Sequence, residues 1–138
     1  MATLIDTDIA IELRDGSAWA AAKISQLEAP LLVSAITRIE LENGVRAVPA
    51  EAEIRQLRVD RILQTIETLD FGIREIDAYR RILSITGFSR RKIADRMTAA
   101  TALAHGIPLA TLNGRDFLNV PDLELIAWER PAEVSDQQ

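Results

Sequence analysis

The stretch TLIDTD, residues 3–8, decides the fold, because a short strand-forming run there leads directly into the acid Asp6. Two further short runs, LLV at residues 31–33 and LAT at residues 109–111, have the same buried-strand character. Amphipathic segments with helical spacing separate the three runs. Short strands that alternate with helices are typical of an α/β domain with a parallel sheet, since parallel neighbours need a crossover connection.

The remaining elements follow from apolar periodicity and from the residues that stop helices. Pro49 cannot continue a helix, and Gly87 and Gly106 are typical helix ends. We expect a single domain over residues 1–130 and a disordered tail over residues 131–138, which is short and polar. Within the domain we expect helices over residues 7–13, 17–27, 37–48, 50–68, 73–85 and 93–105, a helical turn over 113–118, and strands over 3–5, 31–33, 109–111 and 123–127.

Composition excludes several classes of protein. The 138 residues are 48% hydrophobic and 27% charged, which suits one globular domain with a core of its own. No apolar run reaches the roughly 20 residues that span a bilayer. The N-terminus has no basic region before its apolar residues and does not resemble a signal peptide. We therefore expect a cytoplasmic protein without a membrane partner.

The chain has no cysteine and a single histidine, His105. This excludes a thiol nucleophile, a disulfide framework, zinc sites that use cysteine and chemistry that needs two imidazoles. There is also no nucleophile elbow and no glycine-rich phosphate loop. Carboxylate chemistry remains, and carboxylate oxygens suit Mg²⁺ or Mn²⁺.

Four acids fall where the strands of the predicted sheet end or where the following helices begin. Asp6 follows the first strand, and Glu40 lies early in the helix after the second. Asp95 lies in the first turn of the alanine-rich helix, and Asp116 follows the strand at residues 109–111. The carboxyl ends of parallel strands meet at one edge of a sheet, so we expect these acids to converge. Clustered carboxylates repel one another, and a divalent cation relieves the repulsion.

Each acid also has a purely structural interpretation. Residues 37–40, Thr-x-x-Glu, read as a capping box, and residues 113–116 read as a similar cap. Asp95 near a helix start favours the helix dipole, and Asp6 is a typical residue at a strand-to-helix turn. Taken singly, the acids fit these structural interpretations; four of them at one edge of the sheet favour a metal site.

Five stretches, in order and with suitable spacing, resemble the motifs of PIN-domain ribonucleases, in particular the VapC toxins of bacterial toxin–antitoxin pairs. The resemblance extends from Leu4 to Trp128, nearly the whole chain. The stretches are LIDTD at 4–8, SAITRIEL at 34–41 with Gly44, DRMTAATALAHG at 95–106, TLNGRDF at 111–117 and LIAW at 125–128.

The resemblance implies a three-layer α/β/α fold with a mostly parallel central sheet of about five short strands. It implies that Asp6, Glu40, Asp95 and Asp116 hold one or two Mg²⁺ or Mn²⁺ ions and carry the hydrolysis of RNA phosphodiester bonds, leaving 5′-phosphate and 3′-hydroxyl ends. It further implies a homodimer and a VapB-like antitoxin as partner.

The chain departs from the family pattern at two positions. Asp8 stands where the family usually has a neutral Asn or Ser, and Thr98 replaces an aliphatic residue. We expect Asp8 to cap the helix that follows, and the alternative is an outer acid of the metal site. We also expect His105 to cap a helix end at the surface, and Trp19 and Trp128 to lie in the core or at a dimer contact.

The net charge of −5 argues against nucleic acid as a partner, but the basic residues are unevenly distributed. Six of the sixteen lie in one short stretch, which can bind phosphates locally or can be a solvated helix face and loop. They are Arg80, Arg81, Arg90, Arg91, Lys92 and Arg96.

Two alternative functions compete with the nuclease. Asp6 and Asp8 resemble the nucleophile and acid of haloacid-dehalogenase-like phosphatases, but that family needs a downstream lysine and a late acidic pair. Only Lys23 and Lys92 are present, and no such pair follows Lys92. A non-catalytic PIN-like binding module is the other alternative, and the presence of all four acids argues against it.

Overall fold

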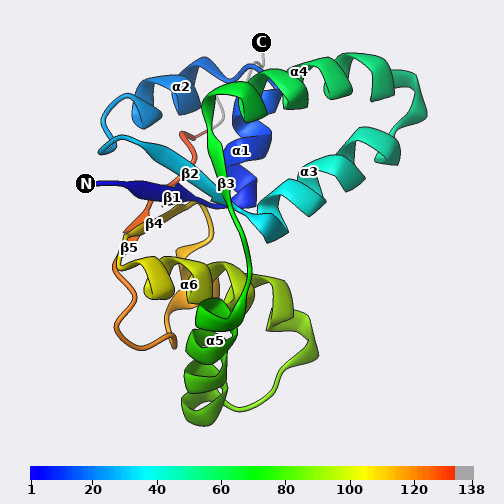
Figure 1. Ribbon diagram of the computed structural model, residues 1–138. Coiled ribbons are helices and arrows are strands. Elements are labelled where there is room, and N and C mark those ends of the chain that lie inside the picture. Colours follow the sequence, from blue (N-terminus) through cyan, green and yellow to red (C-terminus); the bar gives the residue numbers. More distant parts are fainter. Residues whose placement is uncertain (133–138) are drawn as a thin grey trace.

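The computed structural model describes residues 1–132, and a five-stranded sheet lies at the centre of this part of the chain (Figure 1). Every neighbouring pair of strands is parallel, in the order β3-β2-β1-β4-β5, so β1 lies in the middle. The expected α/β class with a parallel sheet is confirmed. The strands are β1 (Thr3–Ile5), β2 (Leu31–Ser34), β3 (Glu67–Leu69), β4 (Leu109–Thr111) and β5 (Leu125–Ala127).

Serine caps and glycine ends set the limits of several helices. The Ser17 and Ser34 hydroxyls accept the N–H groups of Ala20 and Thr37, and Gly106 closes a helix in the left-handed conformation, with φ of 63°. No helix in residues 1–132 is long and apolar enough to cross a membrane. The helices are α1 (Thr7–Arg14), α2 (Ala18–Ile24), α3 (Ala35–Ala47), α4 (Ala52–Thr65), α5 (Ile73–Thr86) and α6 (Ile93–His105), with 3₁₀ turns η1 (Pro49–Glu51), η2 (Arg90–Lys92) and η3 (Gly114–Phe117).

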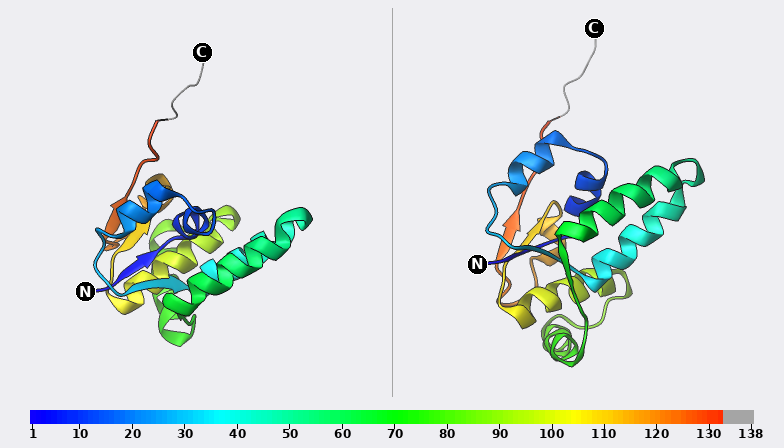
Figure 2. Two further views of the ribbon diagram at one scale, coloured as in Figure 1. Left: turned by 90° about the horizontal axis from the view of Figure 1, so that it is seen from above. Right: turned by 45° about the horizontal axis from the view of Figure 1, so that its top comes forward.

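Helices cover both faces of the sheet, which gives the expected three layers (Figure 1). Alternate residues of each central strand enter different cores, because side chains alternate across a strand. In β1, Leu4 joins the core beneath α5 and α6, whereas Ile5 joins the core beneath α1, α3 and α4. Figure 2 shows α3 and α4 as a hairpin that projects beyond the sheet.

One strand was missed by the sequence analysis. Residues 67–69 form β3, whereas the apolar spacing predicts that the helix continues to residue 68. The helix α4 ends at Thr65, Ile66 is extended, and Glu67–Leu69 pair with β2 in register. Pairing at the sheet edge therefore overrides a helical pattern that carries two β-branched residues at its end.

Other boundaries differ slightly from expectation. The helix α3 begins at Ala35 and not at residue 37, because Ser34 supplies the cap. The helix α2 ends at Ile24, and β5 begins at Leu125. Of the tail predicted to be disordered, residues 133–138 lie outside the described residues.

Candidate active site

Asp6 lies at the centre of the carboxyl edge of the sheet. It follows β1 directly and is the N-cap of α1, where one carboxylate oxygen accepts the Thr7 N–H at 2.8 Å. The other oxygen accepts the hydroxyl of Thr111, the last residue of β4, also at 2.8 Å. The residue is only 7% exposed. The strand order thus places a buried carboxylate between two neighbouring strand ends.

Asp8 does not cap α1, so that prediction is wrong. It lies in the first turn, and one of its oxygens accepts the Leu112 N–H at 3.1 Å and the Asn113 side-chain amide at 2.8 Å. The Thr111 hydroxyl lies 3.3 Å from the same oxygen. Asp8 therefore fixes the loop after β4 against α1 and brings a second carboxylate to the site.

Glu40 reaches the site through a threonine that the sequence analysis did not single out. The Thr7 hydroxyl donates a short hydrogen bond to Glu40 and lies 2.9 Å from the Thr37 hydroxyl. Ser34 caps α3, so Glu40 lies in the second helical turn and does not complete a capping box. The capping interpretation of Glu40 is wrong, and its carboxylate faces α1.

Asp95 and Asp116 complete the acidic cluster from the other side. Asp95 lies in the first turn of α6, as expected, and is partly buried. Asp116 lies in η3, with its carboxylate 3.8 Å from the Lys92 ammonium, which also donates to its carbonyl. Because Asn113 makes no side-chain cap bond to η3, the capping interpretation of residues 113–116 is not supported.

The carboxylates of this cluster affect one another electrostatically. Burial, together with the negative charges of Asp8 and Asp95, raises the pKa of the Asp6 carboxyl from 3.8 to about 7, against the opposing hydrogen bonds of Thr111 and Thr7. Burial also raises the pKa of Asp8.

Three neighbouring carboxylates act on the pKa of Asp95. Burial raises the pKa of Asp95, and the charges of Asp116, Glu40 and Asp8 raise it further, while Lys92 lowers it. The four acids selected from the sequence therefore share one electrostatic environment, and Asp8 is a fifth member.

The chemistry of this donor set fits a divalent metal ion, because hard carboxylate oxygens are the ligands that Mg²⁺ and Mn²⁺ prefer. Within residues 1–132, however, no three such side chains converge closely enough to hold one ion as they stand. The carboxylates are bound by protein groups, Asp6 and Glu40 by threonine hydroxyls and Asp116 by Lys92. Metal binding therefore requires some of them to rotate.

The basic stretch divides into an exposed and a buried part. Arg90 and Arg91 in η2 are exposed, as are Arg80 and Arg81 on α5. Arg96 is only 7% exposed and donates to the Gly87 carbonyl at 2.6 Å. Arg96 therefore belongs neither to a phosphate-binding patch nor to a solvated helix face, the two interpretations that the sequence left open.

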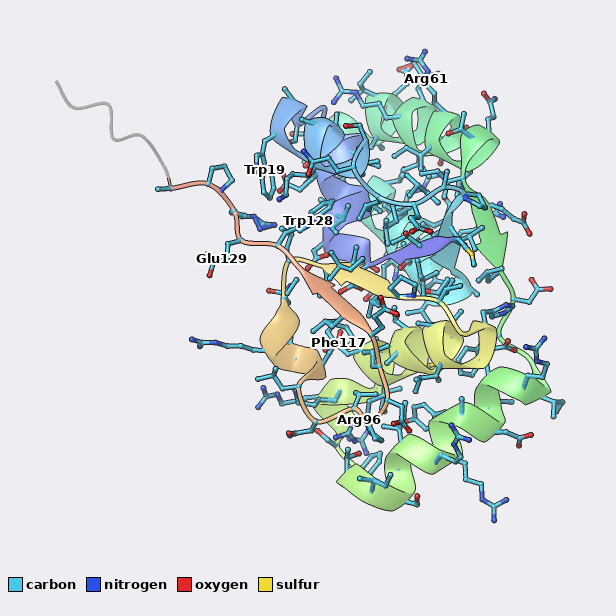
Figure 3. The ribbon with its side chains drawn as sticks, turned by 90° about the vertical axis from the view of Figure 1, so that its left-hand side faces the viewer. Trp19, Arg61, Arg96, Phe117, Trp128 and Glu129 are labelled. Atoms are coloured by element: carbon cyan, nitrogen blue, oxygen red, sulfur yellow. The ribbon has the colours of Figure 1, made fainter. Side chains whose placement is uncertain are left out.

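The two tryptophans are packed together near the end of β5. The rings of Trp19 and Trp128 meet edge to face (Figure 3), and their centroids are 6.2 Å apart. The Lys23 ammonium lies 5.5 Å from the centroid of the Trp128 ring. Trp128 belongs to the core on the α1 side of the sheet, which agrees with the expected core role. His105 pairs with the buried Glu75 at 3.1 Å, so it links α6 to α5.

The sequence matches the PIN domain over residues 3–123. The chain therefore belongs to the PIN-domain family.

Two relatives are similar over nearly their whole length. Ribonuclease VapC1 of Rickettsia felis is 32% identical over 136 residues, which cover 91% of this chain and 96% of the relative. Ribonuclease VapC of Rickettsia bellii is 30% identical over 130 residues, with the same two coverages.

Solved structures show the same fold. The structure of VapBC2 from Rickettsia felis, bound to a DNA fragment from its promoter, matches with a TM-score of 0.81 and 23% identity, covering 94% of this chain and 100% of the other. The DNA-bound VapBC of Salmonella typhimurium matches with a TM-score of 0.79 and 21% identity, covering 93% and 98%.

Proposed function

We propose that this chain is a VapC-type endoribonuclease, the toxin of a toxin–antitoxin pair, which hydrolyses RNA phosphodiester bonds with carboxylate-bound Mg²⁺ or Mn²⁺. Membership of the PIN-domain family and the two relatives named as ribonucleases support the nuclease activity. The observation that carries the proposal is the position of Asp95, whose pKa is raised by burial and by three further carboxylates from three separate segments.

We assign the metal to Asp6, Glu40, Asp95 and Asp116. A divalent cation held there supplies the positive charge that activates water for in-line attack on phosphorus and stabilises the leaving oxygen. Thr7 links Glu40 to the start of α1 through its hydroxyl. Lys92 lies beside Asp116, where an ammonium can also attract a phosphate. The protein thereby brings acids from four segments to one edge of the sheet, where some of them must rotate to bind the metal.

Asp8 has a supporting role in this proposal. Its hydrogen bonds to the Leu112 N–H and the Asn113 amide hold the loop that leads from β4 to Asp116. Thr111 is held between Asp6 and Asp8, and its hydroxyl also accepts the Asn113 N–H at 3.0 Å. We infer that Asp8 positions this loop and adds negative charge near the metal.

The remaining assignments concern the partner, the domain bounds and the location of the chain. Several of the similar structures are VapBC toxin–antitoxin complexes, which supports a VapB-like antitoxin as the partner of this chain. We propose a homodimer, a single PIN domain over residues 1–130 and a cytoplasmic location.

The positions of the two lysines do not support the phosphatase alternative. Its chemistry needs a lysine beside the nucleophilic carboxylate, but Lys92 pairs with Asp116 and Lys23 lies over Trp128. Neither of the two lysines therefore contacts Asp6 in the described residues.

The test is metal-dependent RNA cleavage by the purified chain, compared with release of phosphate from a small phosphate ester. We expect cleavage with Mg²⁺ or Mn²⁺, none with a chelator, and no phosphate release. Asp95→Asn should abolish cleavage, whereas Asp77→Asn, which removes the same charge from an exposed position on α5, should not. Full nuclease activity of Asp95→Asn would refute the assigned site.

A further inference from the structure

A phenylalanine is presented to solvent in the loop between α5 and η2. Phe88 is 69% exposed. Phe117, in contrast, is 2% exposed and belongs to the core, where Figure 3 labels it. Burying a phenylalanine side chain is favourable by about 1.5–3 kcal/mol, so this residue contributes little to folding where it lies. Two exposed arginines, Arg90 and Arg91, follow it in η2.

The loop that carries Phe88 is held in place from within the protein. The Arg96 guanidinium, 7% exposed, donates to the Gly87 carbonyl at 2.6 Å. Gly87 ends α5 with φ of 77°, a conformation that side chains other than glycine rarely adopt. A buried arginine and a required glycine therefore fix the backbone immediately before Phe88.

The same loop adjoins the acidic cluster. The turn η2 leads directly into α6, whose first turn carries Asp95. Lys92, the last residue of η2, lies 3.8 Å from the Asp116 carboxylate. A polymer whose phosphate lies at the carboxylates can therefore extend across η2 toward Phe88.

We propose that Phe88 is a stacking platform for an unpaired base of the RNA, and that Arg90 and Arg91 bind the phosphates beside that base. This inference rests on the proposed ribonuclease function and assigns to it a substrate-binding residue outside the carboxylate cluster. An aromatic ring stacks on any base, but only an unpaired base exposes its face. Neighbouring cations favour a nucleic acid over an apolar protein surface at this loop.

The test measures RNA binding separately from cleavage. A chelator keeps the wild-type chain and its variants inactive, and fluorescence anisotropy then gives the affinity for a short labelled single-stranded RNA, the same RNA as a duplex, and an abasic strand of equal length. Stacking predicts that Phe88→Ala weakens binding of the single strand at least about fivefold and leaves the abasic strand unaffected. Phe88→Trp should restore the affinity, because stacking needs only an aromatic ring.

Ile85→Ala is the matched control, since Ile85 is also largely exposed, at 65%, but is not aromatic. It should bind the single strand as the wild type does. Equal affinity of Phe88→Ala and wild type for the single strand would overturn the proposal. So would a loss of affinity shared by the abasic strand, or a change of oligomeric state in Phe88→Ala, which would indicate a protein contact instead.

The two proposals fail in different experiments. If the wild-type chain binds RNA through Phe88 but cleaves none when Mn²⁺ is added, the proposed catalytic function is wrong and the stacking platform stands. If it cleaves RNA and Phe88→Ala binds and cleaves single strands normally, the platform is wrong and the nuclease stands.

Discussion

Neutralising Asp6 should have opposite effects on stability and on activity. In the metal-free protein the Asp6 carboxylate is buried beside Asp8 and Asp95, and the pKa of its carboxyl is raised from 3.8 to about 7. Asp6→Asn removes this charge with almost no change of shape. We therefore expect a more stable metal-free protein that cannot cleave RNA.

The magnitude follows from the difference between the two pKa values. A folded-state pKa of about 7 against an unfolded value of 3.8 corresponds to about 4 kcal/mol, at about 1.4 kcal/mol per pKa unit. The folded chain keeps the proton that the unfolded chain loses near pH 4, so unfolding releases a proton between these values. Stability of the metal-free wild type therefore falls as the pH rises through this window, and the loss is complete only above about pH 7.

Asparagine can replace the carboxylate without leaving its partners unsatisfied. Its side-chain oxygen can accept the Thr7 N–H, which now bonds to Asp6 at 2.8 Å. Its amide faces Thr111, whose hydroxyl can accept from the amide and donate to Asp8, 3.3 Å away. We allow about 1 kcal/mol for this rearrangement and expect a net gain of about 2–3 kcal/mol above pH 7.

The assay is thermal and denaturant unfolding from about pH 4 to pH 8, with a chelator or with excess Mn²⁺. Asp6→Asn should be less stable than the wild type by about 1 kcal/mol at the acidic end, where only the rearrangement cost remains, and more stable at the alkaline end. Excess Mn²⁺ should stabilise the wild type more than it stabilises Asp6→Asn. Metal that binds only the folded state adds stability, and the variant lacks one of the proposed metal ligands. A variant less stable than wild type above pH 7 without metal would refute the reasoning, and Asp77→Asn controls for the loss of one exposed charge.

Four further predictions concern neighbouring parts of the structure. Thr111→Val removes the hydroxyl that stabilises the Asp6 carboxylate, so the pH-dependent loss of metal-free stability should move to higher pH in unfolding curves. Gly44→Ala places a Cβ 2.8 Å from a guanidinium nitrogen of the buried Arg14. The gain of about 1 kcal/mol that alanine gives inside a helix should therefore be absent in denaturant unfolding, and Arg14→Met should recover it in a double-mutant cycle. Replacing Arg90 and Arg91, the exposed arginines of η2, with serine should reduce the slope of log affinity for RNA against log salt concentration by about 1–2. An unchanged slope would indicate that these arginines lie in a solvated loop and do not bind RNA. A structure of the chain with its antitoxin should show an arginine or lysine of the antitoxin hydrogen-bonded to the acids of the site. Arginine is favoured because its planar guanidinium can donate two hydrogen bonds to one carboxylate. A complex without such a side chain would contradict this prediction.

The central part of the fold could be predicted because its signals are local. The runs that became β1, β2 and β4 are short, apolar and bounded by residues that end strands, such as Asp6 and Pro30. The helix α6 was predicted with its limits, since Gly106 marks its end. In contrast, β3 lies at the sheet edge and is partly exposed, so only its pairing with β2 distinguishes it from helix.

The basic stretch contained a signal that the sequence analysis did not use. Arg96 lies three and four residues before Ala99 and Ala100, which are fully buried, so helical spacing places it on the same face. A charged residue on an apolar face predicts a buried partner, here the Gly87 carbonyl. The charge count alone could not separate this arginine from the exposed pair in η2.

The positions of the candidate acids could be predicted from the sequence, but the hydrogen bonds among them could not. Positions after strands identified Asp6, and the start of a helix identified Asp95; the contacts of Asp8 with Leu112 and Asn113 join segments about a hundred residues apart. Such contacts depend on the order of the strands, which places β1 beside β4. Local capping rules therefore assigned Asp8 to the wrong role.

The buried carboxylates of the site lower the stability of the metal-free protein, and this penalty connects stability with function. Domains of this size are typically stable by about 5–15 kcal/mol, and the charge on Asp6 alone opposes folding by about 4 kcal/mol above pH 7. Asp8 and Asp95, whose pKa values burial also raises, act in the same direction. Any cation that enters the cluster removes part of this penalty, whether it is a metal ion or the guanidinium of a partner. If a metal ion and a basic side chain of the antitoxin bind the same carboxylates, as we propose, each weakens binding of the other, and the antitoxin could inhibit the chain without a change of fold.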